Sequence, residues 1–324
     1  MSIEVGNGQV VEQDKSQPLK IAFLSQATTN SYLQAAIAAA KAQAKADGAE
    51  ITVFDANSDA QTQYAQTQNV LNSGKYNAIT GYFQDGDSVC SLLTHQAPKQ
   101  NVLVSVIGQP ICNRAQATGL SIWAPGTLSF VGGGGSLAFY QAWVRHISAK
   151  VRTPTQVLLV TGPETLTAIR AEVAAVEAAA KSNPDFKLVD TQYTDLSTQQ
   201  GLSATQNALL AHPGISMVLS HFTPLTQGIV QALQAAGKTG KVKVYDIGGS
   251  TVAAAMLRDG VIEETMPYFP ATQGACGVAV LAAAHRGQSV PRAVYNDCMP
   301  GDNNGIEGPL FYSKDNINEF KPEY

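Results

Sequence analysis

The sequence predicts an α/β protein built from two lobes, each a doubly wound parallel sheet. Three observations lead to this prediction. Short runs of β-forming residues alternate with helical segments along most of the 324 residues. The alternation is interrupted by a turn-rich stretch over 109–126 and then begins again. The chain is also too long for one typical compact domain, so two lobes of ordinary size suit it.

The first series of elements occupies residues 19–107. A strand is predicted over 19–25, and apolar residues at helical spacing from Tyr32 onward predict a helix that ends at Gly48. The series continues with a strand over 51–55, a helix from Asp59 to Gly74, a strand over 77–82, a helix over 87–95 and a strand over 102–107. Strand–helix alternation at this spacing predicts a parallel sheet with helices on both faces.

The second series begins at residue 128 and repeats the pattern. A strand over 128–131 leads through a glycine run to a helix ending near 149, and 156–161 is the clearest strand of the chain. The series continues with a helix over 165–181, a strand over 186–191, a helix over 197–211, a strand over 215–220, a helix over 225–236 and a strand over 241–247. A strand over 261–266 and a helix over 273–286 remain as a tail that two simple halves do not explain.

Composition excludes several classes of function. Hydrophobic residues make up 44% and charged residues 14%, and the net charge is −4 with no block of like charge. This favours large cores and disfavours nucleic acid or an anionic membrane surface as a partner. No apolar stretch approaches the roughly 20 residues of a membrane span. Residues 1–17 are polar, lack a secretory signal and are interpreted as a flexible leader, the remainder of a processed tether.

The four cysteines give a prediction about pairing. None of them forms a C-x-x-C motif, so zinc and redox sites lack support, and four cysteines allow three connectivities. The same interval separates Cys90 from Cys112 and Cys276 from Cys298. This favours a Cys90–Cys112 and a Cys276–Cys298 disulfide, which would imply an oxidising compartment, while buried free thiols are the alternative.

Signatures of enzymes and cofactors are missing from the sequence. The glycine run over 132–135 lacks the spacing of a dinucleotide-binding loop, and neither a P-loop nor a nucleophile elbow occurs. No histidine lies at metal-ligand spacing from another histidine or cysteine. Asp85 and Asp87 form a close carboxylate pair, but capping the next helix is the commoner task for Asp87. We therefore expect no cofactor, no metal and no catalytic residues.

The loops after the predicted strands carry aromatic rings and planar polar groups instead. In doubly wound sheets, ligands bind beyond the carboxyl ends of the strands. These loops contain Tyr32, Tyr82, Phe83, Phe222, Tyr268 and Phe269, together with Asn30, Gln84, Gln109 and Arg170. Rings stack on the C–H faces of sugars, while amides and guanidinium exchange hydrogen bonds with hydroxyls. The combination predicts a small neutral sugar or polyol as ligand.

An ordered set of weak motifs gives a family resemblance. The motifs are Asn30-Ser31-Tyr32-Leu33, QNVLNSGKYNAITGYFQDGDSV over 68–89, QNALLAHP over 206–213, LQAAGK over 233–238, DIGGS over 246–250 and GQSV over 287–290. In this order the chain, from about residue 18 onward, resembles the ribose- and galactose-type periplasmic binding proteins, which are sugar-binding subunits of ABC importers.

The resemblance implies two lobes joined by a three-segment hinge that close on a ligand in the cleft between them. The first lobe would comprise 18–131 plus 268–297. The second would comprise 132–267 plus 298–324, with 1–17 as the leader. This arrangement accounts for the tail strand and helix.

The resemblance also suggests site residues. Asn30 and Tyr32 match the family's first binding loop, and Arg170 matches an arginine early in the second lobe's first helix. This chain departs from the pattern at four places, which we retain among the predicted ligand contacts because they occupy the same loops. They are Gln109 in place of an Asp-Arg pair, His221-Phe222 in place of Asn or Asp, Gly248 after a displaced aspartate, and Tyr268 in place of an amide. Fewer carboxylates favour a deoxy-sugar, a short polyol or a partly apolar solute over ribose itself.

The sequence thus predicts an extracytoplasmic solute-binding protein that delivers its ligand to an ABC permease. We expect a monomer in the periplasm or outside the cell, with a lipid anchor as one option. The alternatives are a ligand-sensing receptor and the effector core of a repressor, although no helix-turn-helix precedes the first strand. An enzyme on a doubly wound scaffold is a weaker alternative, because the loops show no acid/base constellation.

Overall fold

The computed structural model describes residues 1–294 and 311–324, and within them the chain divides into two compact units. The first unit contains residues 1–138, 269–294 and 324, and the second contains 139–268 and 311–323. Each is an α/β unit around a largely parallel sheet, which confirms the predicted fold class. The first passage between units falls after residue 138, not after 131 as the resemblance implied, and the chain returns after residue 268.

The first unit contains a six-stranded parallel sheet in the order β13-β7-β6-β5-β3-β4. Its strands are β3 (Lys20–Ser25), β4 (Glu50–Asp55), β5 (Ala78–Gly81), β6 (Leu103–Ile107), β7 (Ser129–Val131) and β13 (Ala293–Val294). Its helices are α1 (Ser31–Ala46), α2 (Ala60–Ser73), α3 (Ala97–Lys99) and α9 (Pro270–His285), with a π-helical turn (Leu92–Gln96) and a 3-10 turn (Gly119–Ile122).

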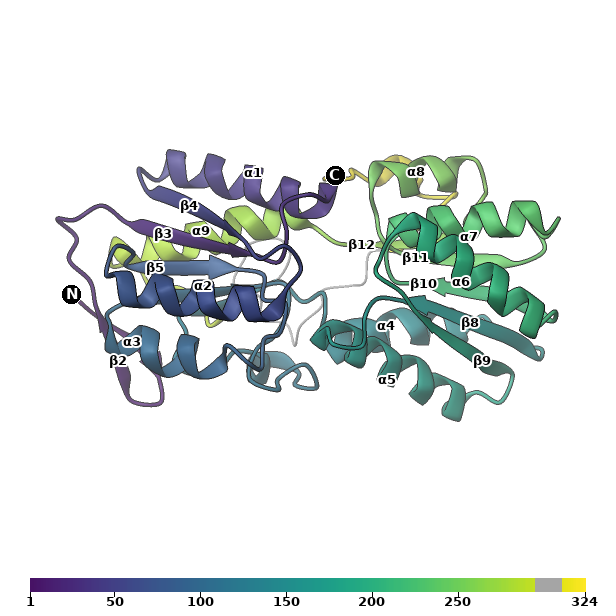
Figure 1. Ribbon diagram of the computed structural model, residues 1–324, viewed down its shortest axis with the longest axis horizontal. Coiled ribbons are helices and arrows are strands. Elements are labelled where there is room, and N and C mark those ends of the chain that lie inside the picture. Colours follow the sequence, from purple (N-terminus) through teal and green to yellow (C-terminus); the bar gives the residue numbers. More distant parts are fainter. Residues whose placement is uncertain (295–310) are drawn as a thin grey trace. The chain divides into compact units, whose positions relative to one another are not determined.

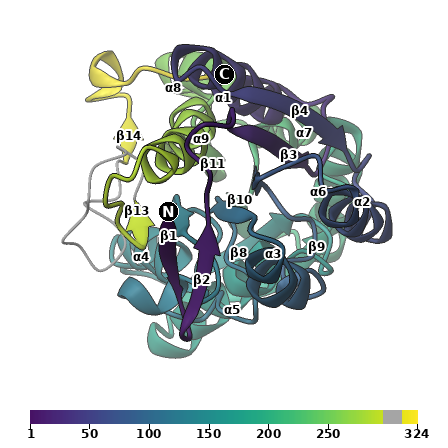
Figure 2. The ribbon, with the colours of Figure 1, turned by 90° about the vertical axis from the view of Figure 1, so that its left-hand side faces the viewer.

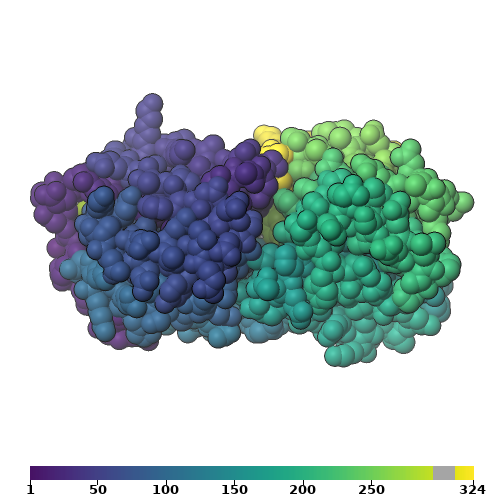
Figure 3. All heavy atoms as spheres, in the orientation of Figure 1, coloured from purple at the N-terminus to yellow at the C-terminus, as the bar shows by residue number. Residues whose placement is uncertain are grey.

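Helices cover both faces of this sheet (Figure 1). In β3, Ile21 and Phe23 pack with α1 and α9, while Ala22 and Leu24 pack with α2 and the π-helical turn. Successive side chains along a strand point to opposite faces of the sheet. Because helices cover both faces, β3 is apolar at consecutive positions and not only at alternate ones. In the space-filling view, segments that include α1 and α2 cover the visible face of this unit (Figure 3).

Helix α9 comes from the tail of the sequence and completes the first unit. It packs directly on α1. A Cβ atom at Gly274 would lie 2.1 Å from the carbonyl oxygen of Ala36, so only glycine permits this close approach. The helix predicted over 273–286, which a division into two simple halves did not explain, is therefore part of the core of the first unit.

The N-terminal segment is ordered, so the prediction of a flexible leader over 1–17 is wrong. Strands β1 (Ser2–Gly6) and β2 (Gln9–Glu12) form an antiparallel hairpin beside α3 (Figure 2). Val5 and Val11 are fully buried in the core shared by α1 and α9. The turn residues Asn7 and Gly8 both have positive φ (53° and 69°), as a two-residue hairpin turn requires. The Asn7-Gly8 pair between valine-containing strands is the sequence pattern that predicts such a hairpin.

The second unit contains a six-stranded sheet in the order β14-β12-β11-β10-β8-β9, in which only β14 is antiparallel to its neighbour. Its strands are β8 (Thr155–Thr161), β9 (Phe186–Tyr193), β10 (Ile215–Ser220), β11 (Lys243–Gly248), β12 (Glu264–Pro267) and β14 (Tyr312–Ser313). Its helices are α4 (Leu137–Ser148), α5 (Thr167–Ser182), α6 (Thr198–Ala211), α7 (Thr223–Ala235) and α8 (Thr251–Arg258), with a 3-10 turn (Ile317–Glu319). Helices α4 and α5 lie on one face and α6 and α7 on the other (Figure 1).

Both sheets bring several strand ends to one edge. The carboxyl ends of β3, β5, β6 and β7 meet in the first unit, and those of β8, β10, β11 and β12 meet in the second. Loops at such an edge are the usual location of ligand sites in α/β sheets. Within the described residues, no helix combines the length and apolar character needed to cross a membrane.

Candidate functional site

In the first unit, two tyrosines and a glutamine meet at the carboxyl edge of the sheet. Tyr82 follows β5, Tyr32 lies at the start of α1, and Gln273 lies in the first turns of α9. Both tyrosine hydroxyls donate to Gln273 Oε1, at 3.1 Å from Tyr82 and 3.4 Å from Tyr32. The two rings meet edge to face with centroids 5.7 Å apart. Tyr82 and Gln273 are buried whereas Tyr32 is half-buried, so Tyr32 is the ring of this group that a ligand can reach.

The loop after β6 adds an unused acceptor to this group. Gly108 has φ 74°, and a Cβ atom there would lie 2.6 Å from Cε1 of Tyr82, so the chain requires glycine at this position. Gln109 follows at once. Its Oε1 is buried and has no hydrogen-bond partner among the described residues. A buried amide oxygen without a partner is costly, which suits a position that receives a ligand hydroxyl.

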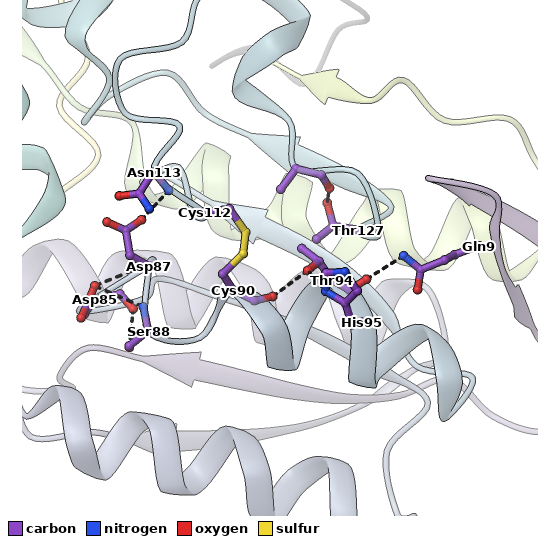
Figure 4. The surroundings of a disulfide bond; sticks show 11 residues. Gln9, Asp85, Asp87, Ser88, Cys90, Thr94, His95, Cys112, Asn113 and Thr127 are labelled. Atoms are coloured by element: carbon purple, nitrogen blue, oxygen red, sulfur yellow. Dashed lines mark hydrogen bonds between the residues drawn. A yellow bond between two sulfur atoms is a disulfide. The ribbon is translucent and has the colours of Figure 1, made fainter.

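A disulfide fixes this loop to its neighbour (Figure 4). The predicted pair Cys90 and Cys112 is bonded, which links the segment after β5 to the loop after β6. On the same two segments, the Cys112 amide donates to the Gly86 carbonyl and the Asn113 amide donates to Asp87 Oδ1 at 2.6 Å. The loop that carries Gln109 is therefore attached to the segment after β5 by one covalent bond and two hydrogen bonds. Of the second predicted pair, Cys298 lies outside the described residues, and that pairing stays a prediction.

The other residues predicted in this unit have structural tasks. Asn30 caps α1, because its side chain accepts from the Leu33 amide at 2.8 Å. Gln84 is half-buried, and its backbone N–H donates to Gln63 Oε1. Phe83 is fully buried in the core under α2, so its prediction as a ligand contact is wrong. Neighbouring residues in an extended segment point to opposite faces, and Tyr82 takes the face of the polar group.

In the second unit, a buried carboxylate holds the histidine that follows β10. Glu172, on α5, is fully buried, and its Oε2 lies 3.0 Å from His221 Nδ1. The Thr161 hydroxyl at the end of β8 donates to the same oxygen. Glu172 Oε1 is buried without a hydrogen-bond partner among the described residues. His221 itself is 8% exposed, so it forms the outer member of this group.

Aromatic rings lie next to His221. The Tyr140 ring centroid is 6.0 Å from that of the imidazole. The hydroxyls of Tyr140 and Tyr268 are 3.1 Å apart, and Tyr268 stacks on Phe139 with centroids 5.4 Å apart and planes 16° apart. Phe139 and Tyr140 are buried whereas Tyr268 is half-buried, so Tyr268 is the ring of this group that presents both an apolar face and a hydroxyl, as carbohydrate recognition requires.

Asp246 lies beneath the Gly248–Gly249 turn and supports it from inside. Thr265 donates to Asp246 Oδ2 at 2.6 Å and in turn accepts from the Gly249 amide at 3.1 Å. The hydroxyls of Thr223 and Thr226 also donate to this carboxyl group. Asp246 is fully buried, and burial raises its pKa to about 6, against the smaller opposite effect of these hydrogen bonds. The displaced aspartate of the DIGGS motif is thus part of the scaffold.

The remaining predicted residues of this unit differ in exposure. Arg170 is exposed, and its guanidinium donates to the carbonyls of Glu164 and Thr165, at 3.3 and 3.0 Å. Phe222 directly precedes α7 and packs in part against the core. Gly248 is buried, and its carbonyl accepts from the Tyr268 amide at 2.9 Å. No observation assigns these three residues to a ligand, and they stay predictions.

Sequence analysis missed Gln273, Glu172 and Tyr140, although two of them left a signal. Glu172 stands one turn from both Ala168 and Val176, so it interrupts the apolar stripe of α5. Gln273 similarly stands near the start of an alanine- and valine-rich helix. A polar side chain on a buried face needs a partner, and that requirement marks it for inspection. Tyr140 had no such signal, because aromatic residues are common in cores.

The first unit therefore offers rings, hydroxyls and amides at its strand ends, and the second offers rings, hydroxyls and a buried Glu–His pair. Across the described residues, no group of three or more His, Cys, Asp or Glu side chains could hold a metal ion. Groups of this kind at the strand ends of α/β sheets lie where such sheets bind small ligands. The chain belongs to the periplasmic binding protein domain family, whose sequence profile matches residues 21–289. This confirms the family indicated by the sequence motifs.

Among curated relatives, the chain is similar to the ribose import binding protein RbsB of Salmonella typhimurium. The two are 31% identical over 105 residues, which is 32% of this chain and 35% of the relative. It is also similar to the D-allose-binding periplasmic protein of Escherichia coli, with 32% identity over 118 residues, 36% of this chain and 38% of the relative. The matched stretch thus spans little more than a third of each relative.

Solved structures show that the likeness in fold is much more extensive. One is an ABC transporter periplasmic solute-binding protein from Actinobacillus succinogenes with bound D-allose, with a TM-score of 0.76 at 19% identity, covering 94% of this chain and 100% of that one. Another, from Bacillus halodurans with bound myo-inositol, has a TM-score of 0.79 at 17% identity and covers 95% and 99%. A third, from Mycobacterium smegmatis with bound glycerol, has a TM-score of 0.76 at 23% identity and covers 94% and 96%.

Proposed function

We propose that this protein is the extracytoplasmic solute-binding subunit of an ABC importer and binds a small neutral sugar or polyol without converting it. The observation that carries the proposal is the pair of polar–aromatic groups at the carboxyl edges of the two sheets. Tyr32 and Gln109 belong to one group, and Tyr140, His221 and Tyr268 belong to the other.

The chemistry of these groups supports a neutral polyhydroxylated ligand. The half-buried rings of Tyr32 and Tyr268 suit the C–H faces of a sugar, and Gln109 Oε1, which no described residue bonds, suits a hydroxyl donor. Relatives named for ribose and allose, and solved structures holding D-allose, myo-inositol or glycerol, support the same class of ligand.

A binding screen tests the proposal. Purified protein, freed of carried-over ligand by unfolding and refolding, is melted with D-ribose, D-allose, D-arabinose, myo-inositol or glycerol. A ligand that binds only the folded state stabilises it, by about 2.7 kcal/mol when the ligand concentration is 100 times Kd. The melting temperature Tm rises accordingly. We expect one or more of these compounds to raise Tm saturably and to be recovered unchanged. No shift with any of the five would contradict the proposal.

Matched variants show whether the candidate site is responsible. Gln109→Leu removes an acceptor that no described residue bonds, at nearly constant volume, and should weaken binding by about 1–3 kcal/mol, the value of one hydrogen bond to a buried polar group. Tyr76→Phe removes a hydroxyl just before β5, at the opposite end of that strand, and should leave Kd unchanged. Equal effects of the two substitutions would exclude Gln109 from the site.

Location and partner are further parts of the proposal. A Cys90–Cys112 disulfide persists in an oxidising compartment, which supports a periplasmic or extracellular location, with or without a lipid anchor. Uptake of the radiolabelled ligand by cells lacking this protein, with and without its re-expression, tests delivery to a permease. Unchanged uptake despite tight binding would favour a ligand-sensing receptor instead.

A further inference from the structure

The inference concerns Glu172, a carboxylate outside the sequence motifs, and it rests on the proposed function. Glu172 has no exposed surface, and its two oxygens differ. Oε2 is close to His221 Nδ1 and receives the Thr161 hydroxyl, whereas Oε1 has no partner in the described parts of the chain.

The contact with Oε2 fixes His221. Imidazole nitrogens lie on opposite sides of the ring, so a proton on Nδ1 that is donated to Glu172 leaves Nε2 on the far side. His221 is almost buried against the Tyr140 ring and cannot rotate freely. The carboxylate therefore determines which nitrogen of His221 a ligand hydroxyl can meet.

The second oxygen bears on the class of ligand. A buried carboxylate oxygen without a partner is costly, and a donor that reaches it removes that cost. Because Glu172 has no exposed surface, a ligand meets this charge through His221, the outer member of the pair. A phosphate or carboxylate bound at His221 would bring a second negative charge close to the buried one, with little solvent to screen the two charges. Arg170, two residues earlier, is exposed and bonded to the carbonyls before its own helix.

We propose that Glu172 is a positioning and specificity residue, which orients His221 through Nδ1 and makes the site select neutral polyols over their phosphorylated forms. The isosteric Glu172→Gln keeps the shape of the side chain and removes its charge. Glu177→Gln, on the exposed face of the same helix α5, is the matched control.

Two measurements test the proposal, and the first needs no ligand. Nitrogen-15 NMR of histidine-labelled protein at pH 8, with His221→Asn to assign the signal, reports which ring nitrogen carries the proton. We expect Nδ1 of His221 to be protonated in the unsubstituted protein and in Glu177→Gln, and the signal to change in Glu172→Gln. A neutral ring with its proton on Nε2 in the unsubstituted protein overturns the positioning role, whatever the protein binds.

The second measurement compares Kd for D-ribose with D-ribose 5-phosphate, and for myo-inositol with myo-inositol 1-phosphate, by calorimetry. We expect Glu172→Gln to weaken binding of the neutral member about tenfold, equivalent to about 1.4 kcal/mol. We also expect it to shift the neutral-to-phosphorylated preference toward the phosphorylated member by a similar factor. A preference unchanged within twofold overturns the specificity role. If neither neutral compound binds, the specificity claim fails together with the proposed function, while the NMR result still decides the positioning claim.

Discussion

The carboxyl group of Asp246 should make the second unit less stable as pH rises from 4 to 7. Burial raises its pKa from 3.8 to about 6. A raised pKa means that the folded state prefers the protonated form. The contribution to stability is therefore fully present below pH 3.8 and is lost as pH rises through about 6. The shift of about 2 pKa units corresponds to a loss of about 3 kcal/mol in the free energy of unfolding.

The substitution Asp246→Asn isolates this contribution because asparagine does not titrate. Asparagine offers one acceptor oxygen in place of two to the threonine hydroxyls, so it should also lower stability by a roughly constant 1–3 kcal/mol. The prediction concerns the difference between the two proteins. The unsubstituted protein should lose about 2 kcal/mol relative to the variant between pH 4 and pH 7, since part of the full effect lies below pH 4.

Urea unfolding at constant ionic strength measures this difference. The chain contains two tryptophans, and Trp143 is buried in the second unit whereas Trp123 belongs to the first. In a Trp123→Phe background, fluorescence therefore reports unfolding of the unit that contains Asp246. The control is Asp259→Asn, at an exposed aspartate of the same unit. Parallel curves of stability against pH for Asp246→Asn and the unsubstituted protein would refute the reasoning.

Three further substitutions test the scaffold of the first unit by urea unfolding. Gly108→Ala should lower the free energy of unfolding by about 2–4 kcal/mol, because it places a Cβ on a left-handed residue and against the Tyr82 ring. A loss below about 0.5 kcal/mol would show that the loop adjusts freely. The double change Cys90→Ser with Cys112→Ser opens a loop with a sequence separation of 22 and should lower the free energy of unfolding by about 3 kcal/mol. Equal stability of the unsubstituted protein with and without reductant would contradict this. Val11→Ala removes two buried methyl groups and should cost about 2 kcal/mol, whereas no loss would mean that the hairpin does not contribute to the core.

Local patterns in the sequence were sufficient to predict the fold class. The strand over 19–25 and the helix beginning near Tyr32 correspond closely to β3 and α1, because short- and medium-range periodicity follows from which faces are buried. The Cys90–Cys112 pairing was also predicted from equal spacing. The hairpin over Ser2–Glu12 was predictable in principle from Asn7-Gly8, but the polar composition of the leader concealed it.

What the sequence by itself determined is therefore the order of elements, the parallel sheets and the edge where loops carry rings and amides. The tertiary structure decided which of those side chains are available. Tyr82 and Phe83 are adjacent aromatic residues that no local pattern distinguishes. Because they point to opposite faces at the end of one strand, Tyr82 bonds Gln273 whereas Phe83 packs in the core with α2. Likewise Glu172 and His221 are 49 residues apart, and only the packing of α5 against the end of β10 brings them within 3.0 Å. Such pairings depend on long-range packing, to which a local pattern is insensitive.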